Sequence, residues 1–415
     1  MPILSLSLLC LACSKQDEAP QQFSSYDLRM DGSWFVPDVG VPSTVASMAI
    51  GDTTASQSLV TAPTPLLSAG DFIYAISATN VTNATSSIII GNESTSKILA
   101  SFPTAKPILE LLADRSAIYA IHVDGKINAI DHGGKNLWQA DLSGFTTTHS
   151  ILTDDVLVGA TDSAITAINI HSGKSTWSYH TSIATTRSLI YDSKSKNIIA
   201  LLSAYTRGVD DSIICYTVTG QVKSRTGFKD SRIISNLCLC GKEKNMIAFG
   251  YLKEPGVSDS ERTMHIALYS GLQRGDIQKT SDHHVSYFAT KVSSNGPIVL
   301  SAGFYNGGSE FESGIDAFYA DDTTKLWQRR FTYPIVTPVA VSAKFAYFTL
   351  TFSTEALVPA KTIFYTLDLS TGKTLGELPI AGKQEAEVNG IPMPVNGRGF
   401  MFSGPGKPVI YFLKP

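Results

Sequence analysis

The sequence has little charge and no long apolar run in its interior. Charged residues make up 17% of the 415 residues, and the formal net charge is −3. No basic stretch or stripe is present, which argues against a nucleic-acid partner. No interior stretch approaches ~18 uninterrupted apolar residues, so an internal membrane-spanning helix is not expected. Long helical periodicities are also missing, whereas Gly, Ser and Thr are abundant, and this balance favours an all-β fold.

Cysteine is scarce as well. There are five cysteines, and two of them lie within the first 13 residues. Cys238 and Cys240 are two residues apart in an expected strand, so they point to one face and cannot bridge each other without strain. A bond from Cys215 to either of them, across adjacent sheets, would require an oxidising compartment. Buried free thiols are the alternative.

What the chain does contain is one pattern written twice between residues 109 and 182. Each copy has short apolar runs, a small residue, a turn that contains Gly-Lys and then a tryptophan. In the order small residue, turn glycine and tryptophan, the copies give Ala129, Gly134 and Trp138, then Ala167, Gly173 and Trp177. The spacing between the two tryptophans is 39 residues. Such a period is typical of a β-propeller blade or a related repeat array.

Each position of the pattern has a physical role. Short apolar runs between polar residues predict strands that bury at least one face. Glycine accepts a positive φ at no steric cost, which suits the turns. Alanine is small where neighbouring strands must come close. The tryptophan supplies a large ring, which we expect to pack between one blade and the next.

Two later stretches are weaker copies of the same pattern. Residues 317–327 keep the Ala, the Lys and Trp327, but Thr323 replaces the glycine. Residues 366–376 keep Gly372 and the Lys after it, but the tryptophan is lost. The pattern resembles the PQQ-like repeat, whose usual form is a small residue, Leu, Asp, two variable positions, Thr-Gly-Lys, two variable positions and Trp. This resemblance implies a quinoprotein-type β-propeller.

The expected architecture follows from the number of strand pairs along the chain. We predict an eight-bladed β-propeller over residues 51–415, in which an N-terminal strand completes the last, C-terminal blade. Pairing the two ends in one blade would leave no open sheet edge. Residues 14–50 lack a sustained period and are expected to form a flexible tether. Trp34-Phe35-Val36 interrupts this range and is expected to dock on the propeller or on a partner.

The first 13 residues resemble a bacterial lipoprotein signal peptide. They form a short apolar run that ends in Ala12-Cys13 and is followed by polar residues. The resemblance implies that Cys13 is lipidated and holds the protein at a membrane without crossing it. Cys10 stands where such signals usually have Leu, and no basic residue precedes the run. An ordinary cleaved signal and a buried N-terminus are the alternatives.

Signal, tether and propeller together resemble the BamB family of outer-membrane assembly lipoproteins. That resemblance implies a non-enzymatic periplasmic scaffold, anchored to the outer membrane and binding the barrel-inserting subunit of the β-barrel assembly machinery. In this family an Arg-containing loop after the third Trp-type repeat contacts that subunit. Only Arg187 is in a comparable place. An ordinary exposed loop arginine is the alternative interpretation.

Two other functions remain open at this point. PQQ-like repeats also form quinoprotein dehydrogenases, which use pyrroloquinoline quinone and Ca²⁺. Those enzymes need a carboxylate base, Ca²⁺ ligands and an aromatic floor, and many carry adjacent cysteines. Here Leu239 separates Cys238 from Cys240, and the site residues do not carry over. We therefore predict no catalytic residue, metal or cofactor. The third possibility is a PQQ-like lipoprotein that serves another envelope complex.

Overall fold

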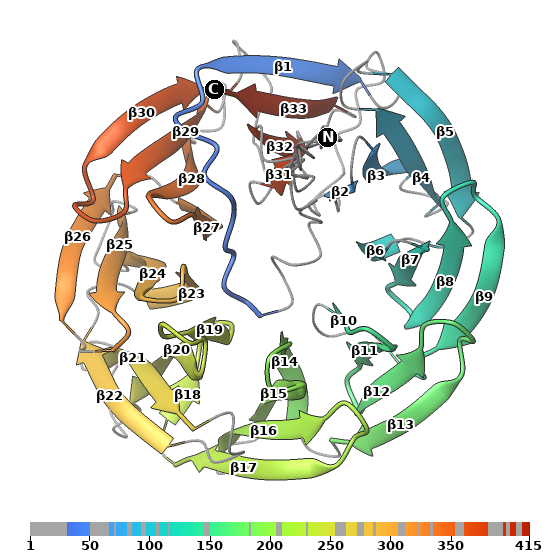
Figure 1. The fold of residues 1–415 in the computed structure, drawn as a ribbon, viewed down its shortest axis with the longest axis horizontal. Helices are drawn as coiled ribbons and strands as arrows, with labels where there is room; N and C mark the ends of the chain where they lie inside the picture. Colours follow the sequence, from blue (N-terminus) through green and yellow to red (C-terminus); the bar gives the residue numbers. More distant parts are fainter. Residues whose placement is uncertain are drawn as a thin grey trace, which may run out of the picture.

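The structure is a computed structural model, and its placed residues form an all-β fold. It describes residues 31–49, 66–69, 72–80, 85–92, 97–104, 106, 108–114, 116–144, 150–181, 184–204, 210–229, 231–253, 263–271, 278–284, 288–305, 312–321, 324–332, 335–352, 361–380, 393–395, 399–403 and 409–415. Antiparallel sheets follow one another around a ring, as in a β-propeller (Figure 1). The coarse prediction of an all-β propeller is therefore confirmed.

The sheets of the first half of the chain have four strands each, in sequence order. The first has β2 (Leu66–Ala69), β3 (Phe72–Asn80), β4 (Thr85–Asn92) and β5 (Lys97–Thr104); the next has β6 (Ile108–Ala113), β7 (Ala117–His122), β8 (Lys126–Asp131) and β9 (Asn136–Asp141). These are followed by β10 (Ile151–Leu152), β11 (Val156–Ala160), β12 (Ala164–Asn169) and β13 (Ser175–His180), and by β14 (Ala184–Asp192), β15 (Asn197–Ala204), β16 (Asp211–Thr217) and β17 (Val222–Phe228).

The second half continues the ring. A five-stranded sheet has β18 (Ser231–Ile233), β19 (Cys238–Cys240), β20 (Met246–Lys253), β21 (Thr263–Ser270) and β22 (Gln278–His284). Then come β23 (Phe288–Ser294), β24 (Ile298–Tyr305), β25 (Glu312–Tyr319) and β26 (Lys325–Phe331), and β27 (Ile335–Val341), β28 (Phe345–Phe352), β29 (Lys361–Asp368) and β30 (Thr374–Pro379). The last sheet has the order β1 (Thr44–Ala49), β33 (Val409–Lys414), β32 (Gly399–Ser403) and β31 (Met393–Val395).

Burial falls from the inside of each sheet to its outside. Every residue of β7 is buried, whereas β9 and β13 alternate between exposed and half-buried residues. The inner strands therefore read as continuous apolar runs, because both of their faces pack against neighbouring sheets. The outer strands keep the period of two, because one face meets solvent.

The cysteines show how the core is divided between sheets. Cys215 packs in the cluster between the β14–β17 sheet and the five-stranded sheet, together with Phe249. Cys238 and Cys240 lie on the opposite face of the five-stranded sheet, in the cluster with Val292. All three thiols are free and buried. A sheet separates Cys215 from the other two, so the thiols are structural core residues and not a disulfide.

The chain's early and late segments meet in one sheet. β1 pairs antiparallel with β33 in a register that joins Thr44 to Lys414 and Ala49 to Val409. Figure 1 shows residues 31–49 running from the inner side of the ring past β27 and β28 to β1. These residues fall in the range expected to be a tether, and the structure gives them defined partners. The signal peptide and the tether up to residue 30 lie outside the described residues and stay predictions.

No helix among the placed residues has the length and apolar character to cross a membrane.

Candidate functional site

The repeat tryptophans join one sheet to the next. The indole N–H of Trp138 donates to the carbonyl of Ile170 at 2.7 Å, from the β6–β9 sheet to the β10–β13 sheet. Trp177 makes the same bond to Val218, at 2.8 Å, in the following sheet. Trp327 donates to Leu369 at 2.7 Å. Each indole is thus half-buried at a sheet boundary, with its polar hydrogen satisfied across it.

A turn glycine of the neighbouring sheet lies under each indole. Gly173 has φ +69°, and a Cβ placed there would lie 2.8 Å from the Trp138 ring. Gly220 stands in the same relation to Trp177, and Gly372 to Trp327. Glycine is required on two grounds, because the backbone is left-handed and the ring fills the space of a side chain.

The small residue of the repeat faces its own tryptophan across two paired strands. Ala129, Ala167 and Ala317 pair with Trp138, Trp177 and Trp327 respectively, with a register shift directly after each alanine. All three alanines are fully buried. Gly134 of the first copy lies against the ring of Phe102 from the β2–β5 sheet. Phe102 and Gly220 were missed in the sequence. Gly220 ends a short polar turn after an apolar run, which was a usable signal, whereas Phe102 has no Trp-type motif around it.

The β27–β30 sheet has no tryptophan at the equivalent register. Gly376 pairs with Thr366 at the position that Trp327 holds opposite Ala317. A Cβ on Gly376 would lie 2.4 Å from Cγ1 of Val41. Val41 belongs to the segment before β1, so a residue from the early part of the chain fills the place where the repeat leaves a gap.

We call residues 31–43 the strap. It crosses the inner strands of three successive sheets and contacts each through the backbone. The amides of Leu239 on β19, Ser294 on β23 and Val341 on β27 donate to strap carbonyls at 2.8, 2.8 and 3.0 Å. The acceptors are, in the same order, Asp31, Ser33 and Trp34. The three amides occupy equivalent register positions in their sheets.

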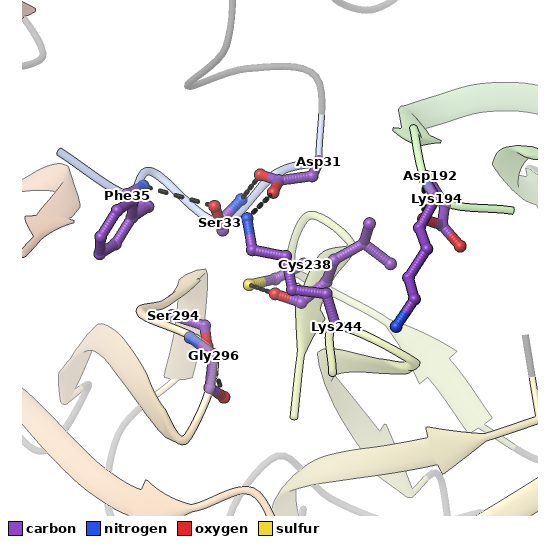
Figure 2. A network of polar contacts seen from close by, with 10 residues as sticks. Asp31, Ser33, Phe35, Asp192, Lys194, Cys238, Lys244, Ser294 and Gly296 are labelled. Carbon is purple, nitrogen blue, oxygen red and sulfur yellow. Dashed lines mark hydrogen bonds and ion pairs between the residues drawn. The ribbon is translucent and has the colours of Figure 1, made fainter. Parts of the chain in front are cut away.

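Side chains fix the strap further. Trp34, Val36 and Val39 have exposed fractions of only 6%, 0% and 4%. Asp31 forms an ion pair with Lys244 at 2.6 Å, and its other oxygen accepts the Ser33 amide at 2.9 Å. Figure 2 shows Lys244 reaching toward Asp31, in a polar network that also includes Ser33 of the strap and Ser294 on β23.

Ion pairs also connect the turns next to the strap. Lys194, in the turn between β14 and β15, pairs with Glu243 at 2.7 Å, and Lys196 in the same turn pairs with Asp154 at 2.8 Å. All four side chains are more than half exposed. Exposed pairs of this kind are screened by solvent, so they contribute little to stability.

Burial changes the pKa values of several groups in the propeller. Desolvation lowers the pKa of Lys291 on β23 and raises that of Cys215 to about 11. It also raises the pKa of Tyr347, whose hydroxyl donates to the Gly40 carbonyl of the strap at 3.1 Å. Buried groups shift toward their neutral forms for this reason. Cys215 is therefore protonated at neutral pH and is not a reactive thiolate.

Of the two predicted functional residues, the structure describes Arg187 but not Cys13. We had expected Arg187 to lie in a loop. It lies instead on the innermost strand β14, at the register shift between Thr186 and Ser188. It is half-buried there. The extended inner strand of its sheet includes this residue because Thr185 and Thr186 already pair with β15. Cys13 lies outside the described residues. No group of three or more His, Cys, Asp or Glu side chains suited to a metal occurs among the described residues.

Comparison with known proteins now bears on the fold. A family model described as outer membrane protein assembly factor BamB matches residues 104–210, which contain both full repeats. The crystal structure of BamB from Moraxella catarrhalis superposes with a TM-score of 0.55 at 13% identity, covering 90% of this chain and 98% of that one. The chain is thus similar to the BamB family in its two full repeats and to a BamB structure in its propeller fold.

Two other solved structures are similar to this chain in fold. Sqt1 from Saccharomyces cerevisiae gives a TM-score of 0.58 at 10% identity, covering 83% of this chain and 93% of that one. The computationally designed Ika8 protein gives 0.57 at 13% identity, covering 88% and 100%. At these identities the likeness shows the fold alone. No curated protein matches the chain in sequence.

Proposed function

We propose that this chain is a non-enzymatic scaffold of the envelope, which binds the barrel-inserting subunit of the outer-membrane β-barrel assembly machinery. The observation that carries the proposal is the BamB family match at residues 104–210. It is supported by a BamB structure that is alike over most of both chains. The function would be geometric: a preformed surface positions a partner without covalent chemistry.

We also propose that the propeller has eight blades and is closed. The sheets follow one another around the ring without a change of topology, and β1 adds to β33 in the last of them. Strand addition between early and late segments is the usual way in which propellers protect their edges. Small-angle scattering on the purified protein tests this, because an open arc of sheets would have a larger radius of gyration than a ring.

The partner proposal is tested by co-purification from detergent-solubilised envelopes. The tagged protein should recover the barrel-inserting subunit, and Arg187→Ala should reduce that recovery if the family's arginine contact is conserved in role. Arg225→Ala is the matched control, because Arg225 is an exposed arginine on β17, the outer strand of the same sheet. Recovery of a different envelope complex would favour the alternative lipoprotein role. Recovery of no envelope protein would exclude both.

Anchoring is proposed to occur through lipid on Cys13, at the periplasmic face of the outer membrane. Metabolic labelling with a palmitate analogue should mark the wild-type protein, and Cys13→Ala should abolish the label. Cys215→Ala is the control, because that thiol is buried. Labelling that persists in the Cys13 variant would contradict the proposal.

We propose no catalytic role. PQQ-like repeats also form dehydrogenases, so this is tested directly by adding pyrroloquinoline quinone and Ca²⁺ to the purified protein. Neither quinone binding nor dye reduction with alcohols or sugars is expected. Turnover would overturn the scaffold proposal.

A further inference from the structure

The strap is bound like a peptide ligand rather than like a connecting loop. The amide of Val36 donates to the Val341 carbonyl at 2.8 Å, and the Val341 amide donates to the Trp34 carbonyl at 3.0 Å. These two bonds flank a parallel bridge between Phe35 and Val341. Reciprocal backbone pairing with the edge of an existing sheet is how extended peptides add to a domain.

The strap also has the side-chain selectivity of a peptide ligand. The Trp34 and Val36 side chains are buried, whereas Asp38 between the buried Val36 and Val39 is exposed. Gly32 has φ +65°, and a Cβ there would lie 2.1 Å from the Leu237 carbonyl oxygen. Because this neighbour is backbone, it cannot turn away as a flexible side chain would.

Other features limit how firmly the strap is held. Trp34 has φ +54°, a conformation that costs a bulky residue free energy. Lys244, which pairs with Asp31, keeps 43% of its side chain exposed. The strap meets each inner strand at one or two residues and not through a continuous ladder. It can therefore leave without breaking any pairing within the sheets, and β1 can stay on β33.

We propose that the inner edges of β19, β23 and β27 form a binding surface for an extended peptide, and that the strap is its built-in occupant. The surface consists of the Leu239, Ser294 and Val341 amides with Lys244 at one end. Its partner is an extended segment of another chain with an acidic residue, a glycine, and then aromatic and β-branched residues. The strap competes with that segment. This inference does not depend on which envelope complex the protein serves.

Hydrogen exchange measured by mass spectrometry on the full chain tests whether the strap can be released. Gly32→Ala should expel it, because the added Cβ meets backbone. Gly40→Ala is the matched control: its φ is also left-handed, at +73°, but nothing lies within 4 Å of an added Cβ. Amide protection at Leu239, Ser294 and Val341 should fall together, by about tenfold or more, in G32A and stay near wild type in G40A. Unchanged protection in G32A overturns the proposal.

A labelled synthetic peptide of residues 31–41 then tests the surface in trans by fluorescence anisotropy. Saturable binding is expected to G32A, with at least about tenfold weaker apparent binding to wild type and G40A, whose own strap occupies the surface. The same peptide carrying Ala at position 32 should not bind. No saturable binding to G32A overturns the proposal, and so does equal binding to all three proteins.

A second strap variant is used if G32A loses protection throughout the chain. Val36→Ser removes a fully buried side chain from the strap and leaves the inner strands untouched. It should expose the same three amides and bind the same peptide. Both experiments use purified protein alone, so their failure is separate from failure to recover an envelope partner.

Discussion

Two boundaries between sheets can be compared directly. Between the β6–β9 and β10–β13 sheets, Trp138 from the repeat lies on Gly173 and donates to Ile170. At the β27–β30 sheet the register-equivalent residue is Gly376, and Val41 of the strap fills the space next to it. The first contact is formed by residues of two successive repeats, and both residues belong to the repeat motif. The second joins segments from distant parts of the chain.

The difference shows that the space between sheets must be filled by a side chain, and that this side chain can come either from the repeat or from the strap. An indole offers both area and a donor, so it stabilises its boundary by packing and by a hydrogen bond. A valine offers packing only, and Val41 is 37% exposed. We therefore expect the tryptophan boundaries to be the stronger ones and the strap boundary to depend on the integrity of the strap.

Removing an indole should have the largest effect. Trp177→Ala removes the bond to Val218, the contact with Gly220 and a stacked contact with Tyr216 at 5.9 Å between ring centroids. The expected loss in the free energy of unfolding is about 3 kcal/mol, near the lower end for aromatic-to-alanine changes because the ring is half-buried. Urea denaturation measures it. Trp177→Phe should lower the free energy of unfolding by about 1 kcal/mol less than Trp177→Ala does, because phenylalanine keeps most of the packing but cannot make the hydrogen bond. A loss below about 1 kcal/mol for W177A would contradict the proposed role of the indoles.

Substituting the glycine beneath an indole should cost somewhat less. In Gly173→Ala the left-handed backbone and the Trp138 ring both oppose the new methyl group, for an expected loss of about 2 kcal/mol. Gly40→Ala has the same backbone cost without a neighbour, so the difference between the two isolates the ring contact. In a Trp138→Ala background that difference should vanish in thermal unfolding curves.

At the strap boundary the expected effect is smaller and coupled. Gly376→Ala should destabilise the protein by roughly 1 kcal/mol, because its methyl group meets Cγ1 of Val41. Val41→Ala should relieve part of that loss. A double-mutant cycle by chemical denaturation measures the coupling, and purely additive values would show that the two residues do not share the boundary.

The smallest expected effect lies in the exposed turn after β29. Hydrogen bonds from the Ser370 and Thr371 side chains lower the pKa of Asp368. A lowered folded-state pKa gives stability that is present above the unfolded value of ~3.9 and is lost as the pH falls below it. Asp368→Asn should cost under about 0.5 kcal/mol at pH 7, since the group is largely exposed. The cost should shrink as the pH falls from about 4 toward 3 in urea titrations.

Much of this fold was readable in the sequence where the repeat is strong. Ala167, Gly173 and Trp177 name the strand, the turn and the boundary residue in one short stretch, because each position needs a particular size or backbone conformation. In the β14–β17 sheet Ser224 stands in place of the tryptophan, so the sequence motif cannot be recognised there although the strand pairing is the same.

The strap was only partly predicted, because docking of Trp34-Phe35-Val36 was expected but the path of the segment was not, and the reason is physical. Its residues have no period, because they cross three sheets one after another rather than running along one. The apolar stretch around Trp34 and Val36 indicated docking, but its partner strands lie far away in sequence, so no local pattern could identify them. Arg187 was placed in a loop because the BamB family has an Arg-containing loop at the comparable place, whereas its backbone follows an inner strand through a bulge.

The pairing of β1 with β33 has a consequence for biogenesis. The hydroxyl of Thr44 reaches the Lys414 carbonyl across a sequence separation of 370 residues. During synthesis, β1 emerges long before residues 409–414 and has no native strand to join until they arrive. Loop closure over such a length is slow. A chaperone that shields unpaired strands would thus protect this segment for nearly the whole time that the polypeptide takes to be made.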